Sequence, residues 1–172
     1  FSPKGDVLTF PTGATPIDFA YAIHTRIGNS CVGAKVDGLR VPLWTKLRNG
    51  QSVEVITAQG QNPQPTWLDM TETGKAKTAI RRALREVDKE RMVVMGKALL
   101  RTAFEHIGKK ASDKSLELAA SKMRFSDSKE LLARVGSTEV RPGHVVQLVH
   151  PEVAAADDFD VDQASAVIGL NE

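Results

Sequence analysis

The sequence of 172 residues has one cysteine, few aromatic side chains and no long apolar run. A lone cysteine, Cys31, excludes an internal disulfide and argues against a cysteine-based zinc site. Every apolar run falls short of the roughly 18 residues that cross a bilayer, so we predict no membrane contact. A reducing, cytoplasmic setting fits this cysteine usage. Because the chain starts with Phe1 and no charged-then-apolar leader follows, we expect a piece of a longer protein.

Motifs for catalysis are also missing. The four histidines show no metal-ligand spacing, and the sequence has neither a phosphate-binding Gly-x-x-x-x-Gly-Lys-Ser/Thr loop nor a Gly-x-Ser-x-Gly elbow. Cys31 could serve as a nucleophile, but its place before an apolar strand favours a buried, inert thiol. The sequence therefore predicts a fragment that is not an enzyme, with no catalytic residue, no metal ligand and no cofactor.

Charge is distributed unevenly along the chain, although the net charge is only +2. Residues 73–110 hold eleven bases and four acids, whereas residues 151–172 hold six acids and no base. The basic stretch indicates either a surface that follows phosphates or a solvated helix face, and the aromatic side chains expected for base stacking are missing there. The candidates for phosphate-backbone contacts are Lys75, Lys77, Arg81, Arg82 and Arg85.

Residues 1–58 have the pattern of a small α+β domain. Two short strands are predicted within residues 1–10, around a turn at residues 3–6. A helix should start at Thr15-Pro16 and run to about Ile27, with Gly28 and Asn29 ending it. Three further strands are predicted at residues 32–36, 39–41 and 53–57. The order of two strands, one helix and three strands is that of a β-grasp (ubiquitin-like) domain.

The remaining chain divides into a linker, a helical domain and a tail. Residues 59–72 are rich in Gln, Asn and Pro, and Trp67 and Leu68 can dock this linker. Residues 73–150 form a small all-α domain, with a long helix to about residue 107 and shorter helices after Ser112, Ser126 and Arg141. Residues 151–172 are predicted to be an acidic, loosely ordered linker.

His24 falls within the apolar arc of its predicted helix when residues are placed at about 100° intervals. One interpretation is a histidine at the rim of the core that caps the end of the helix. The other is a functional side chain. The residues alone leave both open.

Four stretches resemble the TGS domain of the RelA/SpoT family, the bacterial enzymes that make and hydrolyse (p)ppGpp in the stringent response. They are FSPKGDV (1–7), ATPIDFAYAIHT (14–25), VGAKVDG (32–38) and NGQSVEVIT (49–57). Asn62-Pro63 with Trp67-Leu68 is similar to the junction after that domain, and the basic helix is similar to the family's helical domain. Residues 167–170 (VIGL) look like the lead-in to a zinc-finger region that would lie beyond the chain.

The resemblance implies a C-terminal regulatory fragment, with hydrolase and synthetase domains upstream. In the family, the TGS domain binds the 3′ CCA end of uncharged tRNA on a stalled ribosome, with the histidine at the position of His24 as the key contact. Many members have a second histidine where this sequence has Asn29, whose amide can still bond a ribose or base edge. The residues expected at the CCA end are His24, Thr25, Asn29, Lys4 and Lys35.

A second function stays open at this point. SpoT-like relatives bind acyl carrier protein through the TGS domain, so the fragment could instead be a protein-docking module. Acyl carrier protein is acidic, and the basic surface therefore does not separate the two functions. Passing a signal to the upstream catalytic domains of the same chain is compatible with either.

Overall fold

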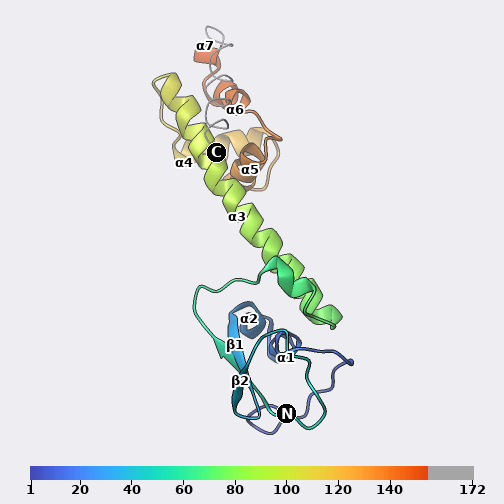
Figure 1. The fold of residues 1–172 in the computed structure, drawn as a ribbon. Coiled ribbons are helices and arrows are strands. Elements are labelled where there is room, and N and C mark those ends of the chain that lie inside the picture. The colour runs from blue at the N-terminus through green and yellow to red at the C-terminus, as the bar shows by residue number, and fades with distance from the viewer. Residues whose placement is uncertain (155–172) are drawn as a thin grey trace. The chain divides into compact units, whose positions relative to one another are not determined.

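The computed structural model describes residues 1–154, and the chain divides into two compact units, Phe1–Val87 and Asp88–Glu172 (Figure 1). Each unit has its own apolar core. No helix within residues 1–154 is long and apolar enough to span a membrane. The elements in chain order are α1 (Pro16–Ile23), α2 (Thr25–Asn29), β1 (Cys31–Val36), β2 (Leu39–Val41), β3 (Val53–Thr57), a 3-10 turn η1 (Pro65–Leu68), α3 (Gly74–His106), α4 (Asp113–Lys122), α5 (Ser128–Gly136), α6 (Pro142–Val149) and α7 (Pro151–Ala154).

The first unit is built on an antiparallel sheet with the strand order β2-β1-β3. β1 and β2 are joined by the predicted tight turn, where Asp37 and Gly38 both have positive φ (51° and 82°). β1 is the central strand, and Ala34 pairs with Val41 on one side and Val55 on the other. The predictions for these three strands are confirmed, and the arrangement is α+β.

The two strands predicted within residues 1–10 are wrong. The predicted turn is present, since the Ser2 amide donates to the Asp6 carbonyl (2.9 Å), but no strand forms in this segment. The apolar residues that suggested strands are used for packing instead. Leu8 and Phe10 pack onto the small core of Phe19, Val36 and Val53, and the rings of Phe10 and Phe19 are 5.7 Å apart. Burial of alternate side chains therefore occurs here without a backbone ladder.

The single helix predicted from Thr15 to Ile27 is also wrong, because it breaks at His24. His24 has extended backbone angles (φ −167°, ψ 146°) and separates α1 from α2. The break allows α2 to turn back onto Tyr21, whose ring contacts Gly28. A Cβ atom at Gly28 would lie 2.2 Å from Tyr21 Cδ1. Gly28 lies inside α2 and supplies this close approach, rather than the positive φ that was expected of it.

A buried carboxylate joins the start of α1 to the start of α3. Asp18 is fully buried and accepts hydrogen bonds from the Thr15 amide (3.0 Å), the Glu72 amide (3.1 Å), and the Thr73 amide and hydroxyl (2.9 and 2.8 Å). The Thr73 hydroxyl in turn accepts from the Ala76 amide (3.2 Å) and so caps α3. The beginning of α3 is therefore fixed to the sheet domain.

The linker is docked, as its tryptophan predicted. Trp67 in η1 is buried in a core that also contains Ile17 and Tyr21 from the sheet domain and Ala76 and Ile80 from α3. The first compact unit consequently extends through the linker and the first turns of α3 to Val87. The division into domains that the sequence predicts, at 1–58, 59–72 and 73–150, stays a prediction.

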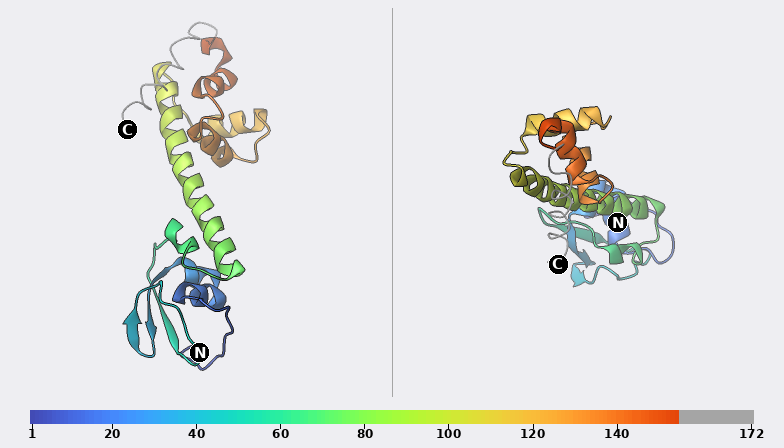
Figure 2. Two further views of the ribbon diagram at one scale, coloured as in Figure 1. Left: turned by 45° about the vertical axis from the view of Figure 1, so that its right-hand side comes forward. Right: turned by 90° about the horizontal axis from the view of Figure 1, so that it is seen from above.

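The second unit consists of the later part of α3 packed against α4, α5 and α6 (Figure 2). The helices predicted after Ser112, Ser126 and Arg141 are all present, with Ser112 and Asp127 as side-chain caps. α3 and α5 touch at two glycines, Gly96 in α3 and Gly136 in α5. A Cβ atom at Gly96 would lie 1.8 Å from the Leu132 carbonyl oxygen. Of the acidic, loosely ordered tail predicted at 151–172, residues 151–154 instead form α7, and the rest lies outside the described residues.

We expect Asp18→Asn to destabilise the first unit by about 1.5–3 kcal/mol, because it weakens hydrogen bonds to a buried charged acceptor. Both tryptophans, Trp44 and Trp67, belong to this unit, so tryptophan fluorescence during urea unfolding follows it selectively. The control is Asp69→Asn, an exposed aspartate that should change stability by less than about 0.5 kcal/mol. Equal midpoints for the two variants would contradict the role given to Asp18.

Gly96→Ala should destabilise the second unit by about 1–3 kcal/mol, since the added methyl group overlaps the backbone of α5. Val94→Ala is the control in the same part of α3, because Val94 is 68% exposed; it should be neutral or stabilising by up to about 0.7 kcal/mol. Far-UV circular dichroism measures both. Similar unfolding midpoints would show that the contact between α3 and α5 is not tight.

Candidate nucleic-acid interface

His24 lies at the surface, in the break between α1 and α2. Its Nδ1 atom accepts a hydrogen bond from the Arg26 amide (3.0 Å) and caps α2. Because Nδ1 is the acceptor, a neutral ring carries its proton on Nε2. The exposed edge of the imidazole thus offers an N–H donor, and its face is open for stacking. His24 is the C-cap residue of α1, as one interpretation expected, and its side chain is also the N-cap of α2, but it is exposed and not at the rim of the core.

Asn29 is fixed at the other end of α2. Its side-chain oxygen accepts from the Tyr21 hydroxyl (2.8 Å), which leaves the amide nitrogen as a donor. Burial raises the pKa of Tyr21, so the phenol stays protonated and keeps this bond. Thr25 is exposed in the first turn of α2. Three of the five residues expected at the CCA end therefore share one short helix and its cap.

Lys75 joins this group from the first turn of α3. Its Nζ donates to the Ala22 carbonyl (3.5 Å), two residues before His24. Arg26, which the sequence prediction missed, is exposed in α2 beside them. The available signal was a basic side chain two positions after His24. His24, Thr25, Arg26, Asn29 and Lys75 are called the α2 site below.

Three of the predicted basic residues lie elsewhere. Lys4 is in the turn of residues 2–6, and Phe1 before it bonds to Val53 at the start of β3 (2.8 Å). Val53 pairs with Val36, the last residue of β1, so Lys4 is at the far end of the sheet from α2. Lys35 is half-buried near the end of β1, next to Val36. Lys77 is half-buried and donates to the Leu68 carbonyl (2.6 Å), which holds η1 against α3.

Arg81, Arg82 and Arg85 are exposed on α3. At 3.6 residues per turn they fall within an arc of about 100°, on the side opposite to the buried Ala76 and Ile80. No ion pair within residues 1–154 engages any of the three. This set is called the α3 arginine face below.

The histidines and Cys31 are the side chains that the sequence offered for metal binding or nucleophilic attack. No set of three or more His, Cys, Asp or Glu side chains among the described residues could hold a metal ion. Cys31 is fully buried, and this burial raises the pKa of its thiol. The thiolate needed for nucleophilic attack is therefore disfavoured, and the inert interpretation holds.

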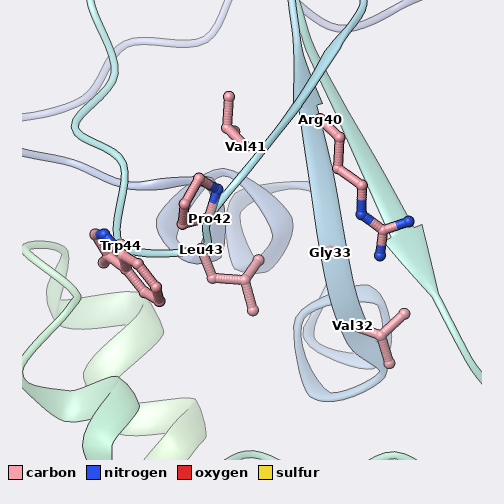
Figure 3. A pocket seen from close by; sticks show the side chains of 7 residues that line it. All are labelled: Val32, Gly33, Arg40, Val41, Pro42, Leu43 and Trp44. Carbon is pink, nitrogen blue, oxygen red and sulfur yellow. The ribbon is translucent and has the colours of Figure 1, made fainter.

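A shallow cleft of about 420 Å³ lies next to the sheet and was also missed (Figure 3). It is lined by residues of β1 and β2 and by the segment after β2. Trp44 and Arg40 stand on opposite sides, with Pro42 and Leu43 between them. The sequence signal was an aromatic residue in an irregular segment, which carries little weight without the structure.

Two protein-family models match this chain. The TGS domain matches residues 1–57, and the RelA/SpoT AH domain matches residues 83–150. The first match covers the sheet with α1 and α2, and the second begins within α3 and ends after α6. Both are regulatory domains, so the prediction of a non-catalytic fragment is confirmed.

Relatives carry names from (p)ppGpp metabolism. A GTP pyrophosphokinase rsh of Brucella abortus is 44% identical over 152 residues, 88% of this chain and 20% of the relative. A guanosine-3′,5′-bis(diphosphate) 3′-pyrophosphohydrolase of Vibrio cholerae is 40% identical over 141 residues, 81% of this chain and 20% of the relative. A bifunctional (p)ppGpp synthase/hydrolase RelA of Mycobacterium tuberculosis is 35% identical over 170 residues, 95% of this chain and 23% of the relative.

The chain spans about a fifth of the length of these curated relatives. The β-grasp sheet domain, the helices after it and the two matched domains in this order agree with the resemblance found in the sequence. The chain belongs to the RelA/SpoT family, of which it carries the TGS domain and the AH domain.

Proposed function

We propose that this chain is the tRNA-sensing part of a (p)ppGpp synthetase/hydrolase, and that the α2 site binds the 3′ CCA end of uncharged tRNA on the ribosome. The observation that carries the proposal is the exposed ring of His24, held by its Nδ1 bond to the Arg26 amide (3.0 Å). A ring fixed on one edge and free on the other can stack on an unpaired base and donate from Nε2. Because this bond sets the orientation of the His24 ring before the ligand arrives, less entropy is lost on binding.

The neighbours of His24 suit an RNA end. Arg26 and Lys75 supply positive charge for a phosphate, while the Asn29 amide and the Thr25 hydroxyl can bond a ribose or a base edge. A free terminal hydroxyl fits where an aminoacyl ester would be excluded, which would give discrimination between uncharged and charged tRNA.

Transmission to the catalytic domains would use the rigid connection between α1 and α3. Lys75 bonds to the Ala22 carbonyl beside the α2 site, and Asp18 bonds to Thr73 at the cap of the same helix. A ligand that shifts α2 therefore acts on the first turn of α3 through short contacts. The hydrolase and synthetase activities of the whole protein, with their domains upstream of Phe1, are part of the proposal.

The test of the α2 site uses His24→Asn, because asparagine is among the best N-cap residues and keeps the bond that starts α2. Binding of uncharged tRNA should weaken by about 1–3 kcal/mol, the range for losing one stacking partner, with an unchanged melting temperature. His24→Glu should bind more weakly still, because its carboxylate repels phosphate.

The same proteins are titrated with aminoacylated tRNA and with acyl carrier protein. Parent-like binding of uncharged tRNA by a stably folded His24→Asn would rule out His24 as the reader of the CCA end. A melting temperature lowered by many degrees would instead make the histidine structural. Loss of acyl carrier protein binding alone would favour the docking module.

The α3 arginine face should contribute to the salt dependence of RNA binding. Replacing Arg81, Arg82 and Arg85 with Gln is expected to flatten the log–log salt slope by up to about 0.7–0.9 per phosphate contact. The matched control replaces three exposed lysines of the second unit. They are Lys97, Lys110 and Lys114. A slope equally reduced by the control would return α3 to the solvated-face interpretation, as would no change in the arginine variant.

A further inference from the structure

Trp44 is the most unusual exposed side chain of the first unit. It is 66% exposed, although the residue before it, Leu43, packs onto the core that contains Tyr21 and Cys31. The backbone that carries Trp44 is therefore anchored while the indole remains at the surface. Large exposed aromatic side chains held in this way are typical of surfaces that bind a planar or apolar partner.

Arg40 lies across the cleft from Trp44 (Figure 3). Its guanidinium covers Gly33: a Cβ atom added to Gly33 would lie 3.1 Å from an Arg40 Nη atom. A glycine at this point of β1 leaves the space that the arginine side chain occupies. No ion pair within residues 1–154 involves Arg40, so its charge is available to an anionic partner.

The charge around the cleft selects the kind of partner. Lys35 pairs directly with Arg40 in the register of β1 and β2, and Glu54 pairs with Lys35 on the other side. Lys46 follows Trp44 by two residues and is exposed. An exposed indole beside excess positive charge matches a nucleotide, which brings a flat base and a phosphate together.

We propose that this cleft binds an unpaired nucleotide, with its base stacked on Trp44 and its phosphate at Arg40. This inference rests on the proposed function, because the same RNA strand would run from the α2 site to the cleft. Asn29 and the cleft residue Val32 are three positions apart, so their Cα atoms are at most about 11 Å from each other. One short single strand can thus occupy both.

The chain itself provides the optical probe. It has two tryptophans, of which Trp67 is 4% exposed and Trp44 is 66% exposed. Titration with a single-stranded RNA ending in CCA should quench the fluorescence of Trp44, and Trp44→Ala should remove this quenching. Trp44→Ala should also weaken binding about 5- to 150-fold, the loss expected for one stacked base.

Three further variants separate the loss of stacking and of charge from general damage to the fold. Trp44→Phe keeps an aromatic face and should retain most of the affinity, whereas Arg40→Gln should weaken binding and reduce its salt dependence. Leu39→Ala removes an exposed apolar side chain that lies in β2 outside the cleft lining and is 72% exposed, and this variant should bind like the parent.

Comparison with His24→Asn distinguishes the two proposals. RNA binding by Trp44→Ala within about twofold of the parent overturns the cleft, while loss of binding in His24→Asn would keep the α2 site. Loss in Trp44→Ala but not in His24→Asn would keep the cleft as an RNA site and overturn the proposed reader of the CCA end. A Trp44→Ala variant that loses only acyl carrier protein would make the cleft a protein surface and overturn the inference.

Discussion

The buried carboxylate of Asp18 is the constraint on which the first unit depends. A charged group out of contact with water is costly unless donors replace its hydration. Four donors from Thr15, Glu72 and Thr73 do so, and Asp18 also lies near the N-terminal ends of α1 and α3, where helix dipoles favour negative charge. The carboxylate therefore requires both helix starts to stay in place at once.

This requirement explains why a segment with the composition of a linker is ordered. The Thr15 hydroxyl donates to the Met70 carbonyl (2.7 Å), close to the point where Glu72 meets Asp18. Trp67 fills the core beneath the same segment. Polar bonds at one end of this segment and apolar burial at the other leave it few free dihedral angles. The segment therefore holds the first turn of α3 rigidly against the part of the fold that carries the α2 site. A site held by a packed scaffold is better oriented than one on a free loop.

Local patterns predicted the elements that local chemistry determines. Alternation and turn residues located β1, β2 and β3, and capping residues such as Ser112 located the helices of the second unit. The failures share one cause, which is dependence on contacts between one element or segment and another. The N-terminal segment packs through Phe10 without pairing, and the helix breaks at His24 so that Gly28 can reach Tyr21. Periodicity cannot report either contact.

In the candidate site too, some residues could be predicted from local sequence, whereas others depend on the packing of the fold. The resemblance indicated His24, Thr25 and Asn29, which are close in sequence, and the fold keeps them together in α2 and its cap. Whether a basic residue joins them depends on the fold: Lys75 does through the Ala22 carbonyl, whereas Lys4 is carried to the other end of the sheet. The sequence predicted which kinds of side chain would bind the ligand, but only the packing decides which charged side chains are close enough to bind the same ligand.

The break at His24 links the folding of this region to its proposed chemistry. An unbroken helix would satisfy the backbone of residues 24–27 internally and would leave no extended residue between α1 and α2. With the break, the Arg26 amide needs an acceptor, and the imidazole supplies it through Nδ1. The bond that completes the helix start is thus the same bond that fixes the ring and places the proton of a neutral imidazole on Nε2. Stability and orientation of the proposed reader come from a single contact, so only a substitution that preserves the cap can separate them.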